Sequence, residues 1–394
     1  MLRHIFIRII RRPLEAFAVL LFTAVIALVL CGLHMGNEAA RERYEEIYTT
    51  IDVRCTVTNL TGDQSDHLTL SVSTLGLFTG TYEYGGSDLM EYVEDVQVKG
   101  SEEITWNGEE YTLTAISSTG IESPLWPENG CAIFWNEGYS ESVFGSDEMV
   151  CLIPEAMAKK MEEQELPTDT LPLLVKSRFP QYETDYEGEV TIIGTYSSED
   201  ATTIYLPWKS YVAMMRSCSR YETVESIYAT LRDNRKLEEF REAASAYFVE
   251  PDPNYAARDE VDGFYYALDI NDYQLKQADL TLRNSMRVNE LVTLLVFAAS
   301  ALAGFLVGFL VIRSRKREIT LMRTLGCSNG RIYEEFAIEQ LACILGGVLL
   351  GGGYTLWHPL WKLVVFAAVN FVGLSTALIV FLNVNLLSSM KEDE

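Results

Sequence analysis

Four long apolar runs constrain the fold of this 394-residue chain more than any other feature. In the clearest of them, Leu291–Ile312, 22 consecutive residues carry no charge. At about 1.5 Å of rise per residue, a helix over this run is roughly 33 Å long and can cross a hydrocarbon core of about 30 Å. Ala16–Met35, Phe336–Trp357 and Leu363–Leu387 are also long and apolar enough. The chain is therefore predicted to be an α-helical membrane protein with four transmembrane helices.

A cleaved signal peptide is the alternative interpretation of the first run, because arginines precede it. The run is longer than the usual signal core of about 7–15 residues, and no small-x-small cleavage site follows it closely. A lipoprotein signal ending at Cys31 fits poorly, since bulky Leu30 precedes the cysteine. We therefore predict an uncleaved first helix. The predicted transmembrane helices cover residues 14–36, 291–312, 334–357 and 363–387.

Basic residues set the predicted orientation of these helices. Four arginines lie before the first helix, and a second basic cluster follows the second helix. That cluster consists of Arg313, Arg315, Lys316, Arg317 and Arg323. By the positive-inside rule both segments face the cytoplasm, so residues 36–286 lie outside and both termini lie inside. The predicted location is the bacterial cytoplasmic membrane, with residues 388–394 as a cytoplasmic tail.

Periodic sequences flank the first two transmembrane helices. In residues 1–13 the apolar side chains fall on one helical face, which predicts an amphipathic helix on the inner membrane surface; an extended start is the alternative. Residues 37–50 and 269–290 contain neither glycine nor proline. We expect both segments to continue the transmembrane helices outward as a two-helix stalk, with Leu268, Leu275 and Leu282 recurring every seven residues.

Residues 51–268 are predicted to form a large extracytoplasmic α+β domain between the first two transmembrane helices. Strand-like segments at 51–60, 111–117, 148–154, 189–196 and 202–207 alternate with helix-like segments at 154–164 and 233–248. A lobe near residues 105–205 is expected to be inserted into a lobe made of the flanking pieces. Residues 36–286 contain 47 acidic and 18 basic side chains, a net charge of −29, which argues against nucleic acid or anionic lipid as partners of this domain.

Several kinds of chemistry are absent from the sequence. No lysine follows a glycine, so the phosphate-binding loop of P-loop ATPases is missing. None of the four histidines precedes a glutamate and no two cysteines have C-x-x-C spacing, so no metal site is expected. Scattered carboxylates are more typical of a solvated surface than of a catalytic pair. We therefore predict no catalytic residue, no bound cofactor and no enzymatic activity.

Four of the seven cysteines, Cys55, Cys131, Cys151 and Cys218, fall in the exterior segment. An even number permits disulfides in any of three pairings, and free buried thiols are the alternative. The sequence does not choose among these.

The stretch GCSNG at residues 326–330 fits G-x-S-x-G, the turn that presents the nucleophilic serine of many esterases. Here it follows a short amphipathic segment, with Ile319, Met322 and Leu325 three residues apart, instead of a strand. We expect Gly326 to end that helix, and Ser328 or Asn329 to cap the next one. Residues 313–333 are thus predicted to form a short cytoplasmic helix and turn that can dock on a soluble partner, and the esterase reading is disfavoured.

The run RKREITLMRTLGCSNGRIYEEFAIEQL (315–341) resembles the second cytoplasmic segment of FtsX-like, MacB-type ABC permeases. That pattern is approximately R-E-I-x-x-x-R-x-x-G-A, a polar turn, and a helix with I-E. The matching positions here are Arg317, Glu318, Ile319, Arg323, Gly326, Ile338 and Glu339, with Cys327 in place of the common alanine. Weaker similarity to the exterior MacB-like core domain covers 151–161, 190–197 and 203–211. The order of one span, a large exterior domain and three spans agrees, whereas the basic C-terminal ending and the fused ATPase of many members are missing.

This resemblance implies a permease dimer, made with a second copy or a paralogue, clasped by two cytoplasmic ABC ATPases that bind ATP and magnesium. In such type VII mechanotransmission systems the ATPases push on the short cytoplasmic helix and the exterior domains move. The expected function is export or extraction of a peptide, drug or lipid-linked molecule, with an exterior adaptor as a further partner. Regulation of an exterior cell-wall hydrolase, or ligand sensing without transport, is the alternative. The expected ATPase-coupling residues are Arg317, Glu318, Ile319, Met322, Arg323, Leu325 and Gly326.

Small residues with small-xxx-small spacing lie in two of the transmembrane helices, at Ser300, Gly304 and Gly308 and at Gly347 and Gly351. Packing within one subunit is favoured over a dimer seam. Glu339, about one turn inside the third helix, is expected to snorkel toward the cytoplasm; pairing with an arginine of the cytoplasmic helix is the alternative.

Overall fold

The structure is a computed structural model that describes residues 13–80, 88–177, 181, 184–197, 202–353 and 360–383. The chain divides into two compact units, a helical unit from Met1–Ile47 with Gln277–Glu394, and a sheet unit from Tyr48–Lys276. The predicted amphipathic helix at 1–13 lies, except for Pro13, outside the described residues, as does the tail at 388–394.

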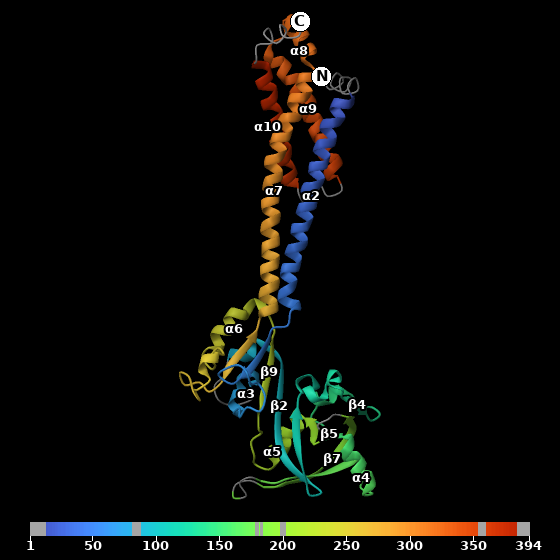
Figure 1. Ribbon diagram of the computed structural model, residues 1–394, viewed down its shortest axis with the longest axis vertical. Helices are drawn as coiled ribbons and strands as arrows, with labels where there is room; N and C mark the ends of the chain where they lie inside the picture. The colour runs from blue at the N-terminus through green and yellow to red at the C-terminus, as the bar shows by residue number, and fades with distance from the viewer. Residues whose placement is uncertain are drawn as a thin grey trace. The chain divides into compact units, whose positions relative to one another are not determined.

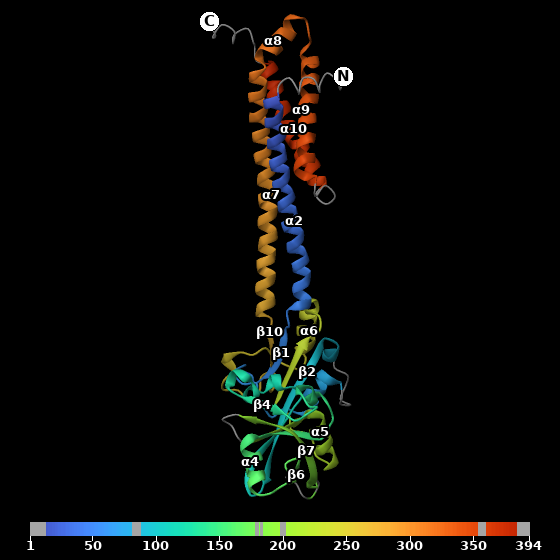
Figure 2. The ribbon, with the colours of Figure 1, turned by 90° about the vertical axis from the view of Figure 1, so that its right-hand side faces the viewer.

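Among the described residues of the helical unit, four helices are long and apolar enough to cross a membrane. They are α2 (Pro13–Thr50), α7 (Tyr273–Ser314), α9 (Asn329–Gly352) and α10 (Leu360–Asn383). Such a set of four helices was predicted from the sequence, and its existence is confirmed. Figure 1 and Figure 2 both show α2 and α7 side by side.

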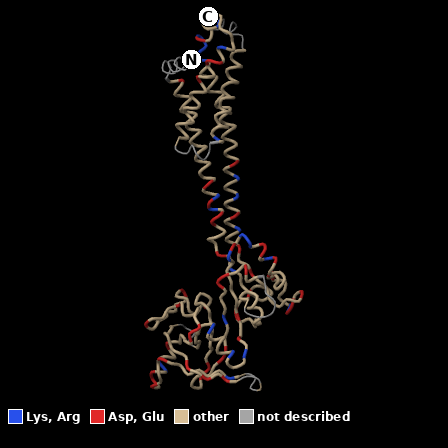
Figure 3. The backbone as a smooth tube through the Cα atoms, turned by 180° about the vertical axis from the view of Figure 1, so that it is seen from behind, with Lys and Arg blue, Asp and Glu red and all other residues tan. Residues whose placement is uncertain are grey.

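Two of the helices are much longer than a bilayer requires. With 38 and 42 residues, α2 and α7 extend over about 57 Å and about 63 Å at the usual helical rise. Their charged residues gather outside the apolar stretch, as Figure 3 shows. Beyond that stretch the helices touch through Arg283, which donates to the Tyr44 hydroxyl at 2.9 Å. The second extension begins at Tyr273 instead of residue 269, because residues 267–271 belong to a strand.

Close helix contacts occur where the sequence has small residues. A Cβ atom at Gly347 or Gly351 would overlap Thr23 or Ala24 of α2, so these glycines allow α9 to approach α2. On the other side of the unit α7 packs against α10. There Ser300 is fully buried, and Gly304 and Gly308 face Asn370 and Leu374. The small residues named above therefore pack against helices of the same chain.

The sheet unit is built on one ten-stranded mixed sheet. Nine strands follow the spatial order β10-β1-β9-β2-β3-β8-β5-β7-β4, and β6 pairs with β7. Only the β3–β8 and β5–β7 pairs are parallel. The strands are β1 (Arg54–Thr58), β2 (Val93–Trp106), β3 (Glu109–Ile116), β4 (Ala132–Trp135), β5 (Val150–Pro154), β6 (Thr170–Val175), β7 (Tyr186–Ser197), β8 (Thr203–Pro207), β9 (Ser226–Leu231) and β10 (Ala267–Asn271).

The segment expected as an inserted lobe, residues 105–205, supplies most of the strands from β3 to β4 in this order. These strands belong to the same sheet as the strands of the flanking segments. The link is a hairpin in which Asn107 and Gly108 both have positive φ, 52° and 83°. An Asn-Gly pair is the preferred two-residue turn for such a hairpin.

Four α-helices accompany the sheet in the part of the unit that the structure describes. They are α3 (Val72–Thr79), α4 (Glu155–Glu163), α5 (Trp208–Ser217) and α6 (Leu237–Ala244). α4 and α6 lie within the two helix-like segments of the sequence, and each buries its apolar side chains while exposing charged ones. The core of the unit includes large buried side chains such as Tyr196, Tyr205 and Tyr211.

Candidate functional site

The site centres on a sharp junction between α7 and α9. α7 ends at Ser314, and a short helix, α8 (Lys316–Thr324), begins after Arg315, whose φ and ψ of −100° and 14° interrupt the helical path. Ser328 then caps α9, its side chain accepting from the Arg331 amide. The chain thus turns twice within about fifteen residues around one short amphipathic helix.

Arg315 is the best-buried cation of the junction, at 2% side-chain exposure. Its two terminal nitrogens donate to both carboxylate oxygens of Glu339 at 2.6 and 2.8 Å, and Nε donates to Glu15 Oε2 at 2.8 Å. The guanidinium also lies 5.4 Å from the ring centre of Phe336. Bidentate pairing of this kind is among the stronger charge-assisted interactions. Arg315 therefore joins the start of α8 to α2 and α9.

This pairing corrects the expectation that Glu339 snorkels. Glu339 is 1% exposed and holds its carboxylate against Arg315 inside the unit. Burial of a charge is tolerated when an opposite charge with good geometry accompanies it, and Arg315 supplies that charge. The pairing alternative was the right one.

The inner face of α8 is anchored in an apolar cluster. Ile319 is fully buried, and Met322 packs against the same cluster. The cluster consists of Ile312, Ile319, Ile332, Phe336, Ala377, Leu378 and Leu382. Arg323 adds a hydrogen bond from Nη2 to the Leu382 carbonyl at 2.6 Å. These side chains hold α8 against α9 and α10.

The outer face of α8 carries exposed apolar side chains. Leu321 is 63% exposed and Leu325 is 82% exposed, and Arg317 is also exposed. The seven expected coupling residues therefore have different environments. Ile319, Met322 and Arg323 secure the helix, Glu318 is half-buried, and Arg317, Leu325 and Gly326 face outward. Leu321, outside that set of seven, belongs with the outward group.

The GCSNG turn has the structure of a helix-to-helix connection. Gly326 adopts φ +84°, a left-handed conformation that favours glycine, and its amide donates to the Arg323 carbonyl at 3.0 Å. A helix precedes the turn, and the Ser328 side chain accepts from a backbone amide. The strand that a nucleophile elbow requires does not precede this serine.

A second buried ion cluster lies in the sheet unit, around Lys99 of β2. Lys99 Nζ is 2.7 Å from Asp66 Oδ2 and 2.8 Å from Glu122 Oε2, and the lysine side chain is only 8% exposed. Burial opposes the charged form of Lys99, but the two carboxylates outweigh it and raise the pKa of Lys99. The pKa of Asp66 is lowered because hydrogen bonds from Lys99 and Ser226 outweigh burial. Burial raises the pKa of Glu122 despite Lys99.

Asp66, His67 and Glu225 bring possible metal-ligating atoms within 4.8 Å of one another beside this cluster. No sequence pattern indicated this group, because Glu225 is far from the other two residues along the chain. Asp66 is already engaged, since Oδ1 accepts from Ser226 at 2.8 Å and Oδ2 from Lys99. A cation on Asp66 would lie next to the lysine ammonium, so the donor set fits a divalent metal poorly.

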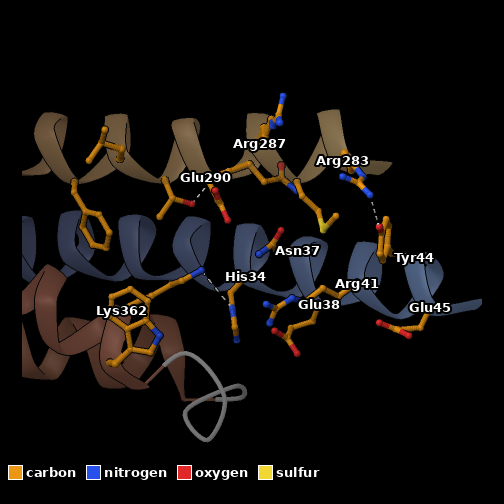
Figure 4. Close-up of a pocket in the computed structure, with 16 residues that line it drawn as sticks. His34, Asn37, Glu38, Arg41, Tyr44, Glu45, Arg283, Arg287, Glu290 and Lys362 are labelled. Atoms are coloured by element: carbon orange, nitrogen blue, oxygen red, sulfur yellow. Dashed lines mark hydrogen bonds between the residues drawn. The ribbon is translucent and has the colours of Figure 1, made fainter. Parts of the chain in front are cut away.

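A cavity of about 1000 Å³ opens beside α2 and α7 in the helical unit, near the start of α10. Figure 4 shows charged side chains of both signs around it, with Lys362 reaching toward His34. The distance from Lys362 Nζ to His34 Nδ1 is 3.5 Å. Trp361 and Phe297 add aromatic surface. No expected site residue lies in this cavity.

All seven cysteines are free thiols in the structure, and six of them are buried. Burial raises the pKa of Cys55 and of Cys151 to about 12. Among the thiols, only Cys327 is half-exposed. The structure thus has the free-thiol arrangement that the sequence left open against disulfides.

The chain matches no family model and no curated protein. The local geometry therefore carries the functional argument.

Proposed function

We propose that the chain is the permease subunit of an ABC complex, in which a separate ATPase acts on α8 and moves the sheet unit. The outward Leu321 and Leu325, with Arg317 beside them, form an apolar and basic surface suited to docking a soluble protein. This exposed face is the observation that carries the proposal. The resemblance of residues 315–341 to MacB-type permeases points to the same partner.

The anchoring of α8 supports a mechanical role. A force on the exposed face is transmitted through Ile319 and Met322, which pack against α9 and α10. It is also transmitted through Arg315, which is hydrogen-bonded to α2 and α9. A load on α8 is thus shared by all four long helices, since α7 leads directly into Arg315. Along the chain, α2 leads into the first strand of the sheet unit, β1, and α7 follows its last strand, β10.

The proposed work is export or extraction of a peptide, drug or lipid-linked molecule. The proposed assembly is a dimer in the bacterial cytoplasmic membrane, with α8 in the cytoplasm and the sheet unit outside. The basic residues around α8 support this orientation through the positive-inside rule. ATP and magnesium would be bound by the partner, because the chain lacks a P-loop.

The docking surface can be tested by purifying the full chain from its host membranes and identifying the P-loop ATPase that accompanies it. The Leu321→Asp, Leu325→Asp double variant should lose that ATPase, because the acid residues replace exposed apolar contacts without disturbing the buried face. Asn329→Asp adds one negative charge at the exposed first residue of α9 and should retain the ATPase. Retention by the double variant would overturn the docking surface.

A further inference from the structure

The cavity beside α2 and α7 lies where the two helices change from apolar to charged sequence. On α7, Leu294 and Phe297 belong to the uncharged run that starts at residue 291, whereas Glu290 precedes it. On α2, Asn37 ends the uncharged run, and the lining residues continue through Glu38 and Arg41. For helices that cross a bilayer, this change marks the boundary between the hydrocarbon and the headgroup region.

Both signs of charge line the cavity on its polar side. Arg41 and Glu38 project from α2, and Glu290 points into the space between α2 and α7 in Figure 4. None of these three makes an ion pair with a residue in the part of the chain that the structure describes. Lys362 lies over the Trp361 ring at 5.9 Å and near His34. Arg283, by contrast, is held by Asp279 at 2.9 Å and by Tyr44.

The other side of the cavity is apolar. Leu294 and Trp361 are 65% and 62% exposed, and Phe297 adds a further ring. Tryptophan is favoured at membrane–water boundaries because its ring is apolar and its N–H is polar. A ligand that fills the cavity must therefore present an apolar part to one side and charges of both signs to the other.

We propose that this cavity binds an amphiphile whose headgroup carries both a phosphate and a primary amine, the chemistry of phosphoethanolamine lipids. Arg41 and Lys362 donate to the phosphate, since a guanidinium and an ammonium are the usual partners of phosphate oxygens. Glu38 and Glu290 accept from the ammonium, which has three N–H donors. The acyl chains lie against Leu294, Phe297 and Trp361.

The proposal requires the helices to be inserted in a membrane but does not require an ATPase. Lipid binding by the isolated chain and ATPase capture through α8 involve different residues, so either result can fail without the other.

Native mass spectrometry of the purified full chain tests the site with three added phospholipids of equal chain length. Phosphatidylethanolamine should be retained about tenfold more than phosphatidylglycerol, which lacks the amine, or phosphatidylcholine, whose quaternary amine has no N–H donor. Soluble phosphoethanolamine, which lacks acyl chains, should not compete at equal concentration. Equal retention of the three lipids, or equal competition by the soluble headgroup, would overturn the proposal.

Charge variants locate the binding. Arg41→Glu and Lys362→Glu should each lower retention of phosphatidylethanolamine by about tenfold, because each removes a phosphate donor. The conservative pair Glu38→Gln, Glu290→Gln should abolish the preference over phosphatidylglycerol while leaving phosphatidylglycerol retention unchanged. Arg43→Glu is the matched control, since Arg43 is exposed on the same helix and does not line the cavity.

Two results would assign the cavity differently and overturn the proposal. If Arg43→Glu lowers retention as much as Arg41→Glu, the lipid preference is a general surface effect. If the wild-type chain is a dimer that retains no lipid and Arg41→Glu converts it to a monomer, a second copy occupies the cavity.

Discussion

Arg315 and Lys99 are each buried between two carboxylates, one cation in each unit. Removing ions from water is costly, and the remaining members of such a group lose their compensation if one is deleted. A single substitution at either cation is therefore expected to destabilise more than a surface charge change. The sequence analysis raised the pairing of Glu339 with an arginine only as the alternative, and no sequence pattern indicated the Lys99 cluster. Arg315 counted only as one of a basic cluster, because its partners Glu15 and Glu339 lie 300 and 24 positions away.

Replacing Arg315 by methionine should destabilise the full chain by about 3–5 kcal/mol, because Glu339 is left buried without its cation. The double variant Arg315→Met, Glu339→Gln should recover part of this loss. Denaturant unfolding in a fixed detergent measures both. Arg313→Met is the control, since Arg313 is exposed two residues earlier; an equal effect there would contradict the importance of the buried pair.

The acid sensitivity of the sheet unit should depend on Asp66. Its pKa is lowered from 3.8 in the folded protein, so its contribution to stability is complete above that value and is lost as the pH falls through the folded pKa. Asp66→Asn should therefore lower the free energy of unfolding at pH 6. Below about pH 4, the free energy of unfolding of the variant should decrease less steeply with falling pH than that of the wild type. Glu122, whose pKa is raised, contributes with the opposite sign, so the variant curve must be compared with the wild-type curve.

Tryptophan fluorescence of the full chain in urea between pH 2 and pH 7 measures the free energy of unfolding of both proteins at each pH. Asp52→Asn, at an exposed carboxylate, serves as the control. Parallel curves for wild type and Asp66→Asn would refute the assignment.

At the scale of elements, local signals in the sequence predicted the long helices and α8, together with α4 and α6 of the sheet unit, whereas α3 and α5 were not predicted. Long uncharged runs, the three-residue apolar spacing before Gly326 and the cap at Ser328 all reappear in α7, α8 and α9. The strands were predicted less completely. β2, β4, β6, β9 and β10 were not predicted, and Leu268 was assigned to a helical repeat although it lies in β10. Residues 267–271 form a strand because they pair with β1, which is distant in the sequence, and the local apolar periodicity carries no information about that pairing.

Packing of α9 against α2 should depend on Gly347 more than on its neighbour Gly346. A Cβ at Gly347 would overlap Thr23, whereas one at Gly346 meets only Leu20 at 3.6 Å. Gly347→Ala should therefore destabilise the chain by about 1–3 kcal/mol, while Gly346→Ala should be neutral or slightly stabilising. Thermal unfolding in detergent compares the two; equal midpoints would show that this close approach does not limit stability.

At the scale of the whole molecule, the sequence predicted two kinds of unit, and the structure has both. No sequence pattern indicated that residues 105–205 share one sheet with the flanking strands, because β2, which leads into the Asn107-Gly108 turn, was not predicted. The exposed surface of α8 was identified only in outline. Which face of a short amphipathic helix is buried depends on α9 and α10, which pack against it.

The proposed orientation places α8 and the sheet unit on opposite sides of the membrane, and cysteine labelling tests it. Cys327 should not react with a membrane-impermeant maleimide on intact cells but should react after permeabilisation, because it is the half-exposed thiol beside α8. Tyr221→Cys, at a residue that is 82% exposed in the sheet unit, should react on intact cells. Labelling of Cys327 from outside would reverse the orientation and remove α8 from the reach of a cytoplasmic ATPase.

The carboxylates that neutralise Arg315 come from the first and third long helices, and the third is synthesised after the arginine itself. During biosynthesis the guanidinium must therefore stay hydrated until α9 arrives with Glu339. A nascent chain ending before α9 has only half of the counter-charge. The ion group is therefore complete only once α9 has packed beside α2 and α7.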